Sequence, residues 1–133
     1  MNAYLLDTNA LLWMGFQSSM IKPEAREALT QGVRFVSVVS IAEIAIKAAL
    51  GKLILPAPFH TDFEAAVRGL LEDGVIDLVP LELAVVAKLR HLPPYHRDPF
   101  DRMIIAQALE LGLAVATRDR AFFAYAGLDI LEV

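Results

Sequence analysis

The sequence contains no cysteine. This absence excludes disulfide bridges, zinc sites built on thiolates and cysteine nucleophiles. The sequence also has no uninterrupted apolar run long enough to cross a bilayer, and its N-terminus shows no basic segment followed by an apolar run and a cleavage site. We therefore expect a cytoplasmic protein that makes no use of a membrane.

Positively charged residues are fewer than negatively charged ones. Lys and Arg number 12 against 16 Asp and Glu, which gives a formal net charge of −4 at pH 7. This balance argues against binding nucleic acid through a broad basic face. The cations gather in two places, residues 47–52 and residues 90–120, although such clusters are also typical of an ordinary solvated surface.

Apolar residues, by contrast, are abundant. The chain is 56% hydrophobic and 21% charged, which is the composition of a globular domain and not of a disordered chain. Its 133 residues are about the length of one domain and enough to bury a core. We therefore treat residues 1–133 as a single domain.

Short aliphatic or β-branched runs alternate with helical patterns along the chain. Strands are expected just before Asp7 and at residues 33–39, 75–81, 113–117 and 128–133. Helices are expected at residues 23–32, 40–51, 61–74, 82–92 and 98–112, with proline-containing loops at 51–59 and 92–97. Because parallel neighbours need crossover connections, this alternation predicts an α/β layered domain around a mostly parallel central sheet.

Four carboxylates fall where the expected elements meet. Asp7 closes the first strand, and Asp119 follows the 113–117 strand by two residues. Glu43 and Asp101 are expected in the first turns of the 40–51 and 98–112 helices. Ligands in such sheets bind outside the carboxyl ends of the strands. The four side chains are therefore expected to meet at one edge of the sheet.

Each of these acids also has a purely structural explanation in helix capping. Ser40 and Glu43 fit a capping box, in which each side chain bonds to the other's backbone N–H. Asp98 precedes a proline at the first helical position, the usual arrangement of an N-cap. The remaining acids could cap or complement the helices that follow them: Asp7, Asp101 and Asp119.

Taken together, the acids are harder to explain by capping alone. Several carboxylates at one sheet edge repel one another unless a cation neutralises them or their pKa values rise. Mg²⁺ and Mn²⁺ take oxygen ligands in octahedral geometry, and Mg²⁺ keeps several waters, which leaves room for a substrate phosphate. The pattern therefore predicts a divalent metal site suited to phosphate chemistry.

Four blocks of the sequence resemble a known family, the PIN-domain ribonucleases, and within it the VapC toxins of bacterial and archaeal toxin–antitoxin pairs. The blocks are "LLDTNALLW" (5–13), "SVVSIAEIAIKAALGKLILP" (37–56), "LPPYHRDPFDRMIIAQA" (92–108) and "LAVATRDRAF" (113–122). One departure is Ala42, where many relatives carry Trp. The resemblance implies a three-layer α/β/α sandwich around a parallel sheet.

The resemblance also implies an activity, partners and a set of site residues. Family members are metal-dependent endoribonucleases, usually dimers, that a cognate antitoxin silences. By this resemblance the catalytic and metal-binding acids are Asp7, Glu43, Asp101 and Asp119. Asp98 is a less certain fifth acid, while Asn9 and Thr117 resemble groups that orient the carboxylates.

The expected reaction is hydrolysis of an RNA phosphodiester by in-line attack of water, with Mg²⁺ or Mn²⁺ at the acids. Cations that could hold phosphates are Lys47, Arg97, Arg102 and Arg118, because guanidinium groups match phosphate oxygens. Lys47 could instead form an i,i+4 pair with Glu43. His96 is more typical of a loop hydrogen-bonding residue than of a general base.

Partners are expected from apolar residues that a small domain does not bury. The segments 40–50 and 63–71 carry apolar positions that could remain exposed, and such patches mark interfaces. We expect a symmetric homodimer and a groove for an antitoxin helix. The alternative is that both segments simply face the sheet.

Three other functions compete with an RNA-cleaving toxin. A signalling receiver, which binds Mg²⁺ at a similar sheet edge, needs adjacent acids after the first strand, whereas this chain has Asp-Thr-Asn. It also needs a Lys after a late strand, where this chain has Arg118. A phosphatase using Asp-x-Asp is disfavoured by Asn9. A catalytically silent PIN-like module is disfavoured by the presence of all four acids.

Overall fold

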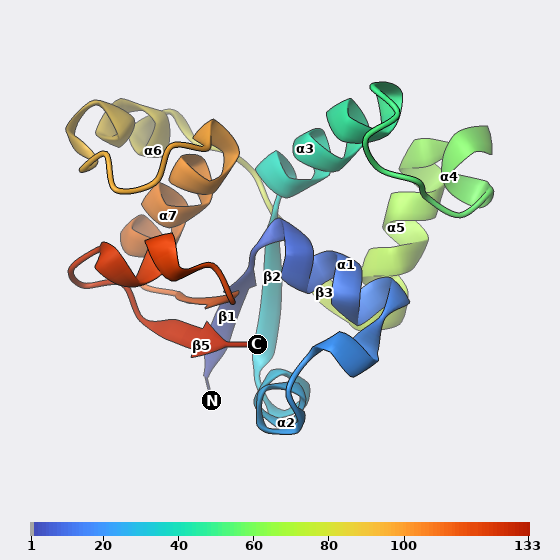
Figure 1. Ribbon diagram of the computed structural model, residues 1–133, viewed down its shortest axis with the longest axis horizontal. Coiled ribbons are helices and arrows are strands. Elements are labelled where there is room, and N and C mark those ends of the chain that lie inside the picture. Colours follow the sequence, from blue (N-terminus) through green and yellow to red (C-terminus); the bar gives the residue numbers. More distant parts are fainter. Residues whose placement is uncertain (1) are drawn as a thin grey trace.

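The structure is a computed structural model that describes residues 2–133, and it is built from alternating strands and helices (Figure 1). The strands are β1 (Ala3–Leu6), β2 (Val33–Ser37), β3 (Ile76–Val79), β4 (Ala114–Thr117) and β5 (Ile130–Glu132). The α-helices are α1 (Thr8–Phe16), α2 (Pro23–Gln31), α3 (Val38–Ala49), α4 (Pro58–Thr61), α5 (Phe63–Gly74), α6 (Leu83–Lys88) and α7 (Pro99–Leu111). Short 3₁₀ helices are η1 (Ser18–Met20), η2 (Leu89–His91) and η3 (Arg120–Ala124).

The sheet has five strands in the order β3-β2-β1-β4-β5, and every neighbouring pair is parallel. From β1 the chain first adds β2 and β3 on one side, and then crosses to the other side of β1 to add β4 and β5. The strand order therefore reverses between β1 and β4. In open parallel sheets this switch point opens a crevice at the carboxyl ends of the two strands, where ligands bind.

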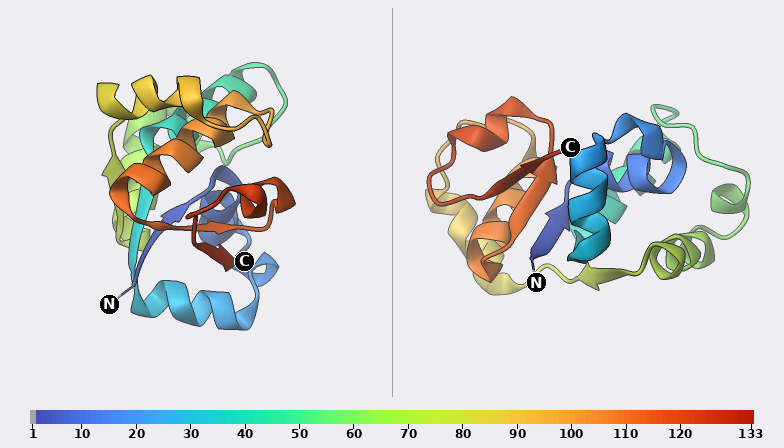
Figure 2. Two further views of the ribbon diagram at one scale, coloured as in Figure 1. Left: turned by 90° about the vertical axis from the view of Figure 1, so that its left-hand side faces the viewer. Right: turned by 90° about the horizontal axis from the view of Figure 1, so that it is seen from below.

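Helices cover both faces of the sheet (Figures 1 and 2). Successive side chains of β1 point to opposite faces, so Tyr4 and Leu6 join one core while Leu5 joins the other. The first core is completed by residues of α1, α2 and α5, and the second by residues of α7 and η3. The three-layer α/β/α fold expected from the resemblance is therefore confirmed.

The helix α7 shows how local sequence places a site residue. Asp98 caps its first turn, with Oδ1 accepting hydrogen bonds from the backbone N–H groups of Phe100 and Asp101, and Pro99 occupies the first helical position. Gly112 ends the helix at φ +68°, a left-handed conformation that glycine adopts without strain. The helix is thus fixed at both ends, with Asp101 in its first turn.

The expected start of α3 was wrong. Ser37 accepts a hydrogen bond at Oγ from the backbone N–H of Val39 and begins the helix at Val38, so the 33–39 strand ends early. The capping box of Ser40 and Glu43 does not form, because Ser37 provides the N-cap three residues before Ser40. Ser40 is instead buried in the body of the helix, and Glu43 lies in its second turn and not in its first.

Smaller differences occur elsewhere. The short helix α4 occupies part of the expected 51–59 loop, and the expected 82–92 helix is divided into α6 and η2. Within residues 2–133, no helix combines the length and the apolar character that a membrane span requires.

Candidate active site

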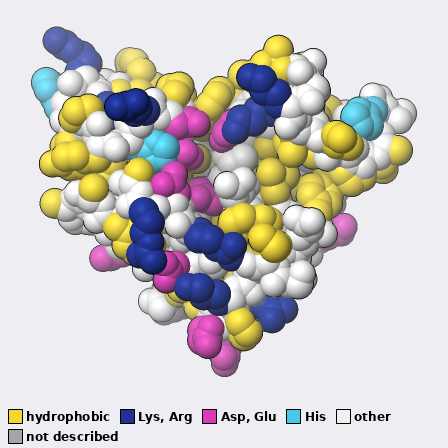
Figure 3. All heavy atoms as spheres, in the orientation of Figure 1, with side chains coloured by type: hydrophobic (Ala, Val, Ile, Leu, Met, Phe, Trp, Pro, Cys, Tyr) yellow, Lys and Arg dark blue, Asp and Glu magenta, His cyan; other side chains and the backbone are white. Residues whose placement is uncertain are grey.

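A cavity of about 470 Å³ lies at the carboxyl ends of β1 and β4, where the strand order reverses. All four acids predicted from the sequence line it, and so do two of the predicted flanking residues, Asn9 and Asp98. Figure 3 shows acidic side chains gathered in a hollow of the surface, with a histidine and cationic side chains around it. The structure therefore brings Asp7, Glu43, Asp101 and Asp119 together.

Asp7 uses its two carboxylate oxygens differently. Oδ1 accepts a hydrogen bond from the backbone N–H of Ala10 at 2.8 Å, which caps α1. Oδ2 accepts a hydrogen bond from the hydroxyl of Thr117, the last residue of β4, at 2.6 Å. Burial raises the pKa of Asp7 to about 6, although both hydrogen bonds act in the opposite direction. The fold therefore holds a carboxyl group where ionisation is costly.

Glu43 reaches the cavity from α3 and is only 4% exposed. Its Oε1 accepts a hydrogen bond from the hydroxyl of Thr8 at 2.6 Å. Its Oε2 lies 2.5 Å from Nζ of Lys47, one turn further along the helix. This hydrogen bond raises the pKa of Lys47. The i,i+4 pair considered for Lys47 is therefore present, and Lys47 still lines the cavity.

His96 connects two acids from different elements. Its Nδ1 accepts a hydrogen bond from the backbone N–H of Asp98 at 3.1 Å, so the ring proton of the neutral imidazole is assigned to Nε2. Nε2 lies 2.7 Å from Oδ2 of Asp119 and 3.1 Å from Oδ2 of Asp101. The Nε2–H group therefore donates to Asp119 and lies close to Asp101.

Asp101 lies close to other negative groups. Burial raises the pKa of Asp101 to about 7, the charge of Asp98 adds to this effect, and His96 opposes it. Asp119 also caps a helix, because its Oδ1 accepts a hydrogen bond from the backbone N–H of Ala121. Asp7, Asp98 and Asp119 therefore all combine capping with a place in the cavity wall.

The loop that carries His96 is held by two side chains. Arg102 donates hydrogen bonds to the carbonyls of Leu92, Pro93 and His96. The hydroxyl of Tyr125 donates to the carbonyl of Pro93 at 2.7 Å and accepts from the backbone N–H of His96 at 3.0 Å. His96 is therefore fixed by groups on both α7 and the segment after η3.

The four cations proposed for phosphate binding separate into two groups. Lys47 and Arg118 line the cavity. Arg97 is exposed and Arg102 is occupied by loop carbonyls, and neither belongs to the cavity lining among residues 2–133. The structure therefore does not bring Arg97 and Arg102 to the carboxylates.

The charges that line the cavity do not balance. Five carboxylates against two cations leave a formal charge of −3 when every acid is ionised and His96 is neutral. Oxygen donors in such numbers suit hard divalent cations. Carboxylate oxygens of Asp101 and Asp119 lie within 4.8 Å of one another, and Nε2 of His96 lies within the same distance of both as a hydrogen-bond donor. The donor set therefore fits a divalent metal ion.

Comparison with known families identifies the family of the chain. The family model of the PIN domain matches residues 4–128 of the sequence. The chain belongs to the PIN domain family. The resemblance drawn from the four sequence blocks is thereby confirmed at the level of the family, and the receiver and phosphatase alternatives are set aside.

Solved structures share the fold of this PIN domain. Similar chains occur in DNA-bound VapBC from Salmonella typhimurium, with 20% identity, 98% of each chain covered and a TM-score of 0.70. They also occur in VapBC2 from Rickettsia felis bound to a promoter DNA fragment, with 12% identity, 97% of each chain covered and a TM-score of 0.65. A third is in FitAcB from Neisseria gonorrhoeae, with 23% identity, coverage of 97% of this chain and 96% of that chain, and a TM-score of 0.60. A search of curated proteins gave no significant match.

Sequence reasoning missed the roles of three residues in the cavity of this PIN domain. Thr8 holds Glu43, His96 joins two acids, and Trp13 lines the wall. Two of them had a signal in the sequence. Thr8 stands within the "DTN" motif. Trp13 follows Asn9 by four residues, which places Asn9 and Trp13 on one helix face. The role of His96 depends on tertiary contacts that no local pattern contains.

Proposed function

We propose that this PIN domain is an endoribonuclease that uses Mg²⁺ or Mn²⁺ to hydrolyse RNA phosphodiester bonds, and that it is the toxin of a toxin–antitoxin pair. The observation that carries the proposal is the convergence of five carboxylates on one cavity at the switch point of the sheet. Raised pKa values at Asp7 and Asp101 support it, because burial, with a smaller contribution from neighbouring acids, makes the ionisation of these carboxyl groups costly, and a bound metal would favour their ionised form.

Asp7, Asp101 and Asp119 are the proposed metal ligands, with Glu43 completing the acidic set. When bound, the metal would activate water and stabilise the negative charge that develops on phosphate oxygens. The chain's own groups fix the orientation of these acids: Thr117 holds Asp7, Thr8 and Lys47 hold Glu43, and His96 holds Asp119.

Other groups of the cavity would act on the substrate's charge. Lys47 and Arg118 keep positive charge at the wall, where they could contact phosphate oxygens. The Nε2 proton of His96 faces Asp119, so it offsets part of the negative charge without a third positive side chain. A few such cations, together with a metal, would let a protein of net charge −4 bind RNA locally.

The partner proposal rests on the complexes in which similar chains occur. The similar structures include VapBC assemblies and a toxin–antitoxin complex from Klebsiella pneumoniae, the latter with 18% identity, 97% of this chain and 96% of that chain covered, and a TM-score of 0.60. We infer a protein antitoxin as the partner of this chain. A toxin that acts on cellular RNA also fits the cytoplasmic location expected from the sequence.

The activity can be tested directly on purified protein and total RNA. With Mn²⁺ we expect discrete RNA fragments whose ends can be mapped, and with a chelator in place of the metal we expect none. Readdition of Mn²⁺ should restore the cuts. Cleavage that persists in chelator would contradict the proposal, and intact RNA under all conditions would favour a catalytically silent PIN-like module.

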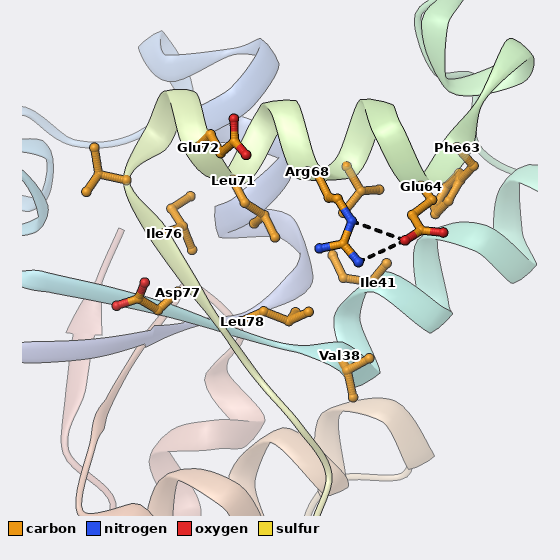
Figure 4. Close-up of a pocket in the computed structure, with 12 residues that line it drawn as sticks. Val38, Ile41, Phe63, Glu64, Arg68, Leu71, Glu72, Ile76, Asp77 and Leu78 are labelled. Atoms are coloured by element: carbon orange, nitrogen blue, oxygen red, sulfur yellow. Dashed lines mark hydrogen bonds and ion pairs between the residues drawn. The ribbon is translucent and has the colours of Figure 1, made fainter.

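A homodimer is also proposed, at a surface that shares no lining residue with the acidic cavity. A cavity of about 530 Å³ opens between α5, β3 and the start of α3. Figure 4 shows Ile41, Leu71 and Leu78 converging on this space. Leu78 and Val38 are 46% and 39% exposed, and within residues 2–133 β3 pairs only with β2, so its outer edge is open. An open edge with apolar side chains is a surface that a second copy could cover.

Of the two segments predicted to carry leftover apolar residues, 63–71 lines this cavity along its length, whereas 40–50 contributes only Ile41. We expect Leu78→Asp to make the protein monomeric at concentrations where the wild type is a dimer, because each interface would bury two unpaired charges. Light scattering coupled to size-exclusion chromatography measures this. Leu109→Asp, at an exposed position of α7, is the matched control and should stay dimeric. A monomeric wild type at high concentration would contradict the dimer.

A further inference from the structure

A second cavity continues from the acidic one. It has a volume of about 610 Å³ and lies between α1 and the segment 53–56. Asn9 and Trp13 line both cavities. We call this second cavity the α1 groove. A molecule that occupies the acidic cavity and extends past Trp13 would therefore enter the α1 groove.

Trp13 is held in place by a cation at the boundary between the cavities. The guanidinium carbon of Arg118 lies 4.4 Å from the centroid of the Trp13 ring. Nε of Arg118 donates to the carbonyl of Val133 at 2.8 Å, and its terminal nitrogen donates to the carbonyl of Met20. Arg118 is thus anchored by backbone groups, and its charge stays beside the aromatic ring.

The α1 groove differs in character from the acidic cavity. Among the described residues that line it, none is charged. It presents the aromatic rings of Trp13 and Phe16, the amides of Asn9 and Gln17, and an apolar wall that includes Ile54. Ile54 is 91% exposed, an unusual position for a large aliphatic side chain. The two cavities together form a surface that is acidic at one end and aromatic, apolar and amide-bearing at the other.

We propose that the α1 groove binds a nucleobase of the RNA, stacked on Trp13, beside the phosphate in the acidic cavity; this rests on the nuclease function proposed above. A nucleotide joins an anionic phosphate to a neutral, flat base with donors and acceptors on its edge. Single-stranded RNA is bound in general by stacking of bases on aromatic side chains, and amides can both donate to and accept from base edges. A protein segment that carries a cationic side chain beside apolar residues is the competing occupant, and the experiments below distinguish it from RNA.

The groove has a built-in reporter, because Trp13 is the only tryptophan of the chain. We expect a mixed-sequence single-stranded RNA hexanucleotide to quench Trp13 fluorescence saturably in an Asp101→Asn background, where the RNA is not cut. Adding Ile54→Asp should weaken the binding about tenfold, since it places a carboxylate where the base would lie. Leu50→Asp, 64% exposed and outside the lining of the groove, carries the same change and should bind as the parent does.

Two further measurements separate base binding from phosphate binding. Uridine 5′-monophosphate should quench Trp13, whereas ribose 5-phosphate, which lacks the base, should not. In cleavage assays Trp13→Leu should raise KM about 5- to 150-fold, the range of one lost stacking contact, with kcat changed less than about twofold. Trp13→Phe should recover most of the loss because it keeps an aromatic face.

The outcomes distinguish this inference from the nuclease proposal. Equal quenching by ribose 5-phosphate, an unchanged KM for Trp13→Leu, or equal binding by the Ile54→Asp and Leu50→Asp variants would overturn the base site. Quenching by a purified antitoxin but by no RNA would also overturn it and assign the groove to that protein. If RNA binds at Trp13 but is never cut, the base site stands and the nuclease function fails.

Discussion

The Asp7→Asn variant is expected to lose metal-dependent RNA cleavage by about 10³-fold or more while its fold stays intact. The loss follows from removing a proposed metal ligand that is fixed on both oxygens. The fold should persist because Asn is as good an N-cap as Asp, so the hydrogen bond from the Ala10 N–H to Oδ1 can remain. The Thr117 hydroxyl can rotate to accept from the new amide.

Stability gives this prediction a second readout. Because burial raises the pKa of Asp7 to about 6, its charge at pH 7.5 destabilises the metal-free fold. The Asn side chain has no such charge, so the melting temperature of metal-free Asp7→Asn should equal or exceed that of the wild type. Cleavage is measured on mapped RNA fragments and stability by thermal unfolding in chelator.

Asp73→Asn is the matched control for this experiment. Asp73 is exposed on α5 and lies outside the acidic cavity, so the same chemical change should leave cleavage within about twofold of the wild type. Two results would contradict the role of Asp7: cleavage by Asp7→Asn at a rate near that of the wild type, or a loss of cleavage that accompanies unfolding.

The sequence located the acids correctly because parallel strands place their carboxyl ends at one edge. Asp7 and Asp119 follow β1 and β4, so their proximity depends only on these two strands being neighbours. The sequence could not choose between capping and cavity lining because the choice is not exclusive. Asp7 caps α1 with Oδ1 and faces Thr117 with Oδ2. One carboxylate has enough oxygens for both roles.

Two features of the site could not be predicted for different physical reasons. Ser37 and Ser40 are both good N-caps, and the strand register that lets Ser37 pair with Val79 is a tertiary property. The place of His96 depends on Tyr125 and Asp119, which lie more than twenty residues further along the chain. A loop residue fixed by such distant partners leaves no periodic signal, whereas a strand or helix does.

Metal-free protein is expected to lose stability as the pH rises from about 4 to about 7. Asp7 and Asp101 have a pKa near 3.8 in the unfolded chain and pKa values of about 6 and about 7 in the folded protein. Between these limits the folded state holds more protons than the unfolded state, so the free energy of unfolding falls with rising pH. Asp7 alone accounts for a fall on the order of 2 kcal/mol. Urea unfolding at a series of pH values in chelator measures it.

The free energy of unfolding of the metal-free wild type against pH is compared with two other curves, those of metal-free Asp7→Asn and of the wild type with saturating Mn²⁺. Subtracting the curve of Asp7→Asn gives the contribution of Asp7 together with its effect on the neighbouring acids, and the difference should grow through the window from pH 4 to pH 6. Saturating Mn²⁺ should act in the opposite direction, because a metal binds ionised carboxylates and competes with their protons. At 100 times its Kd it would add about 2.7 kcal/mol, most fully above pH 7. A difference curve that is flat, combined with no stabilisation by Mn²⁺ at pH 7.5, would show that the fold does not raise the pKa of Asp7 and that the acids hold no metal.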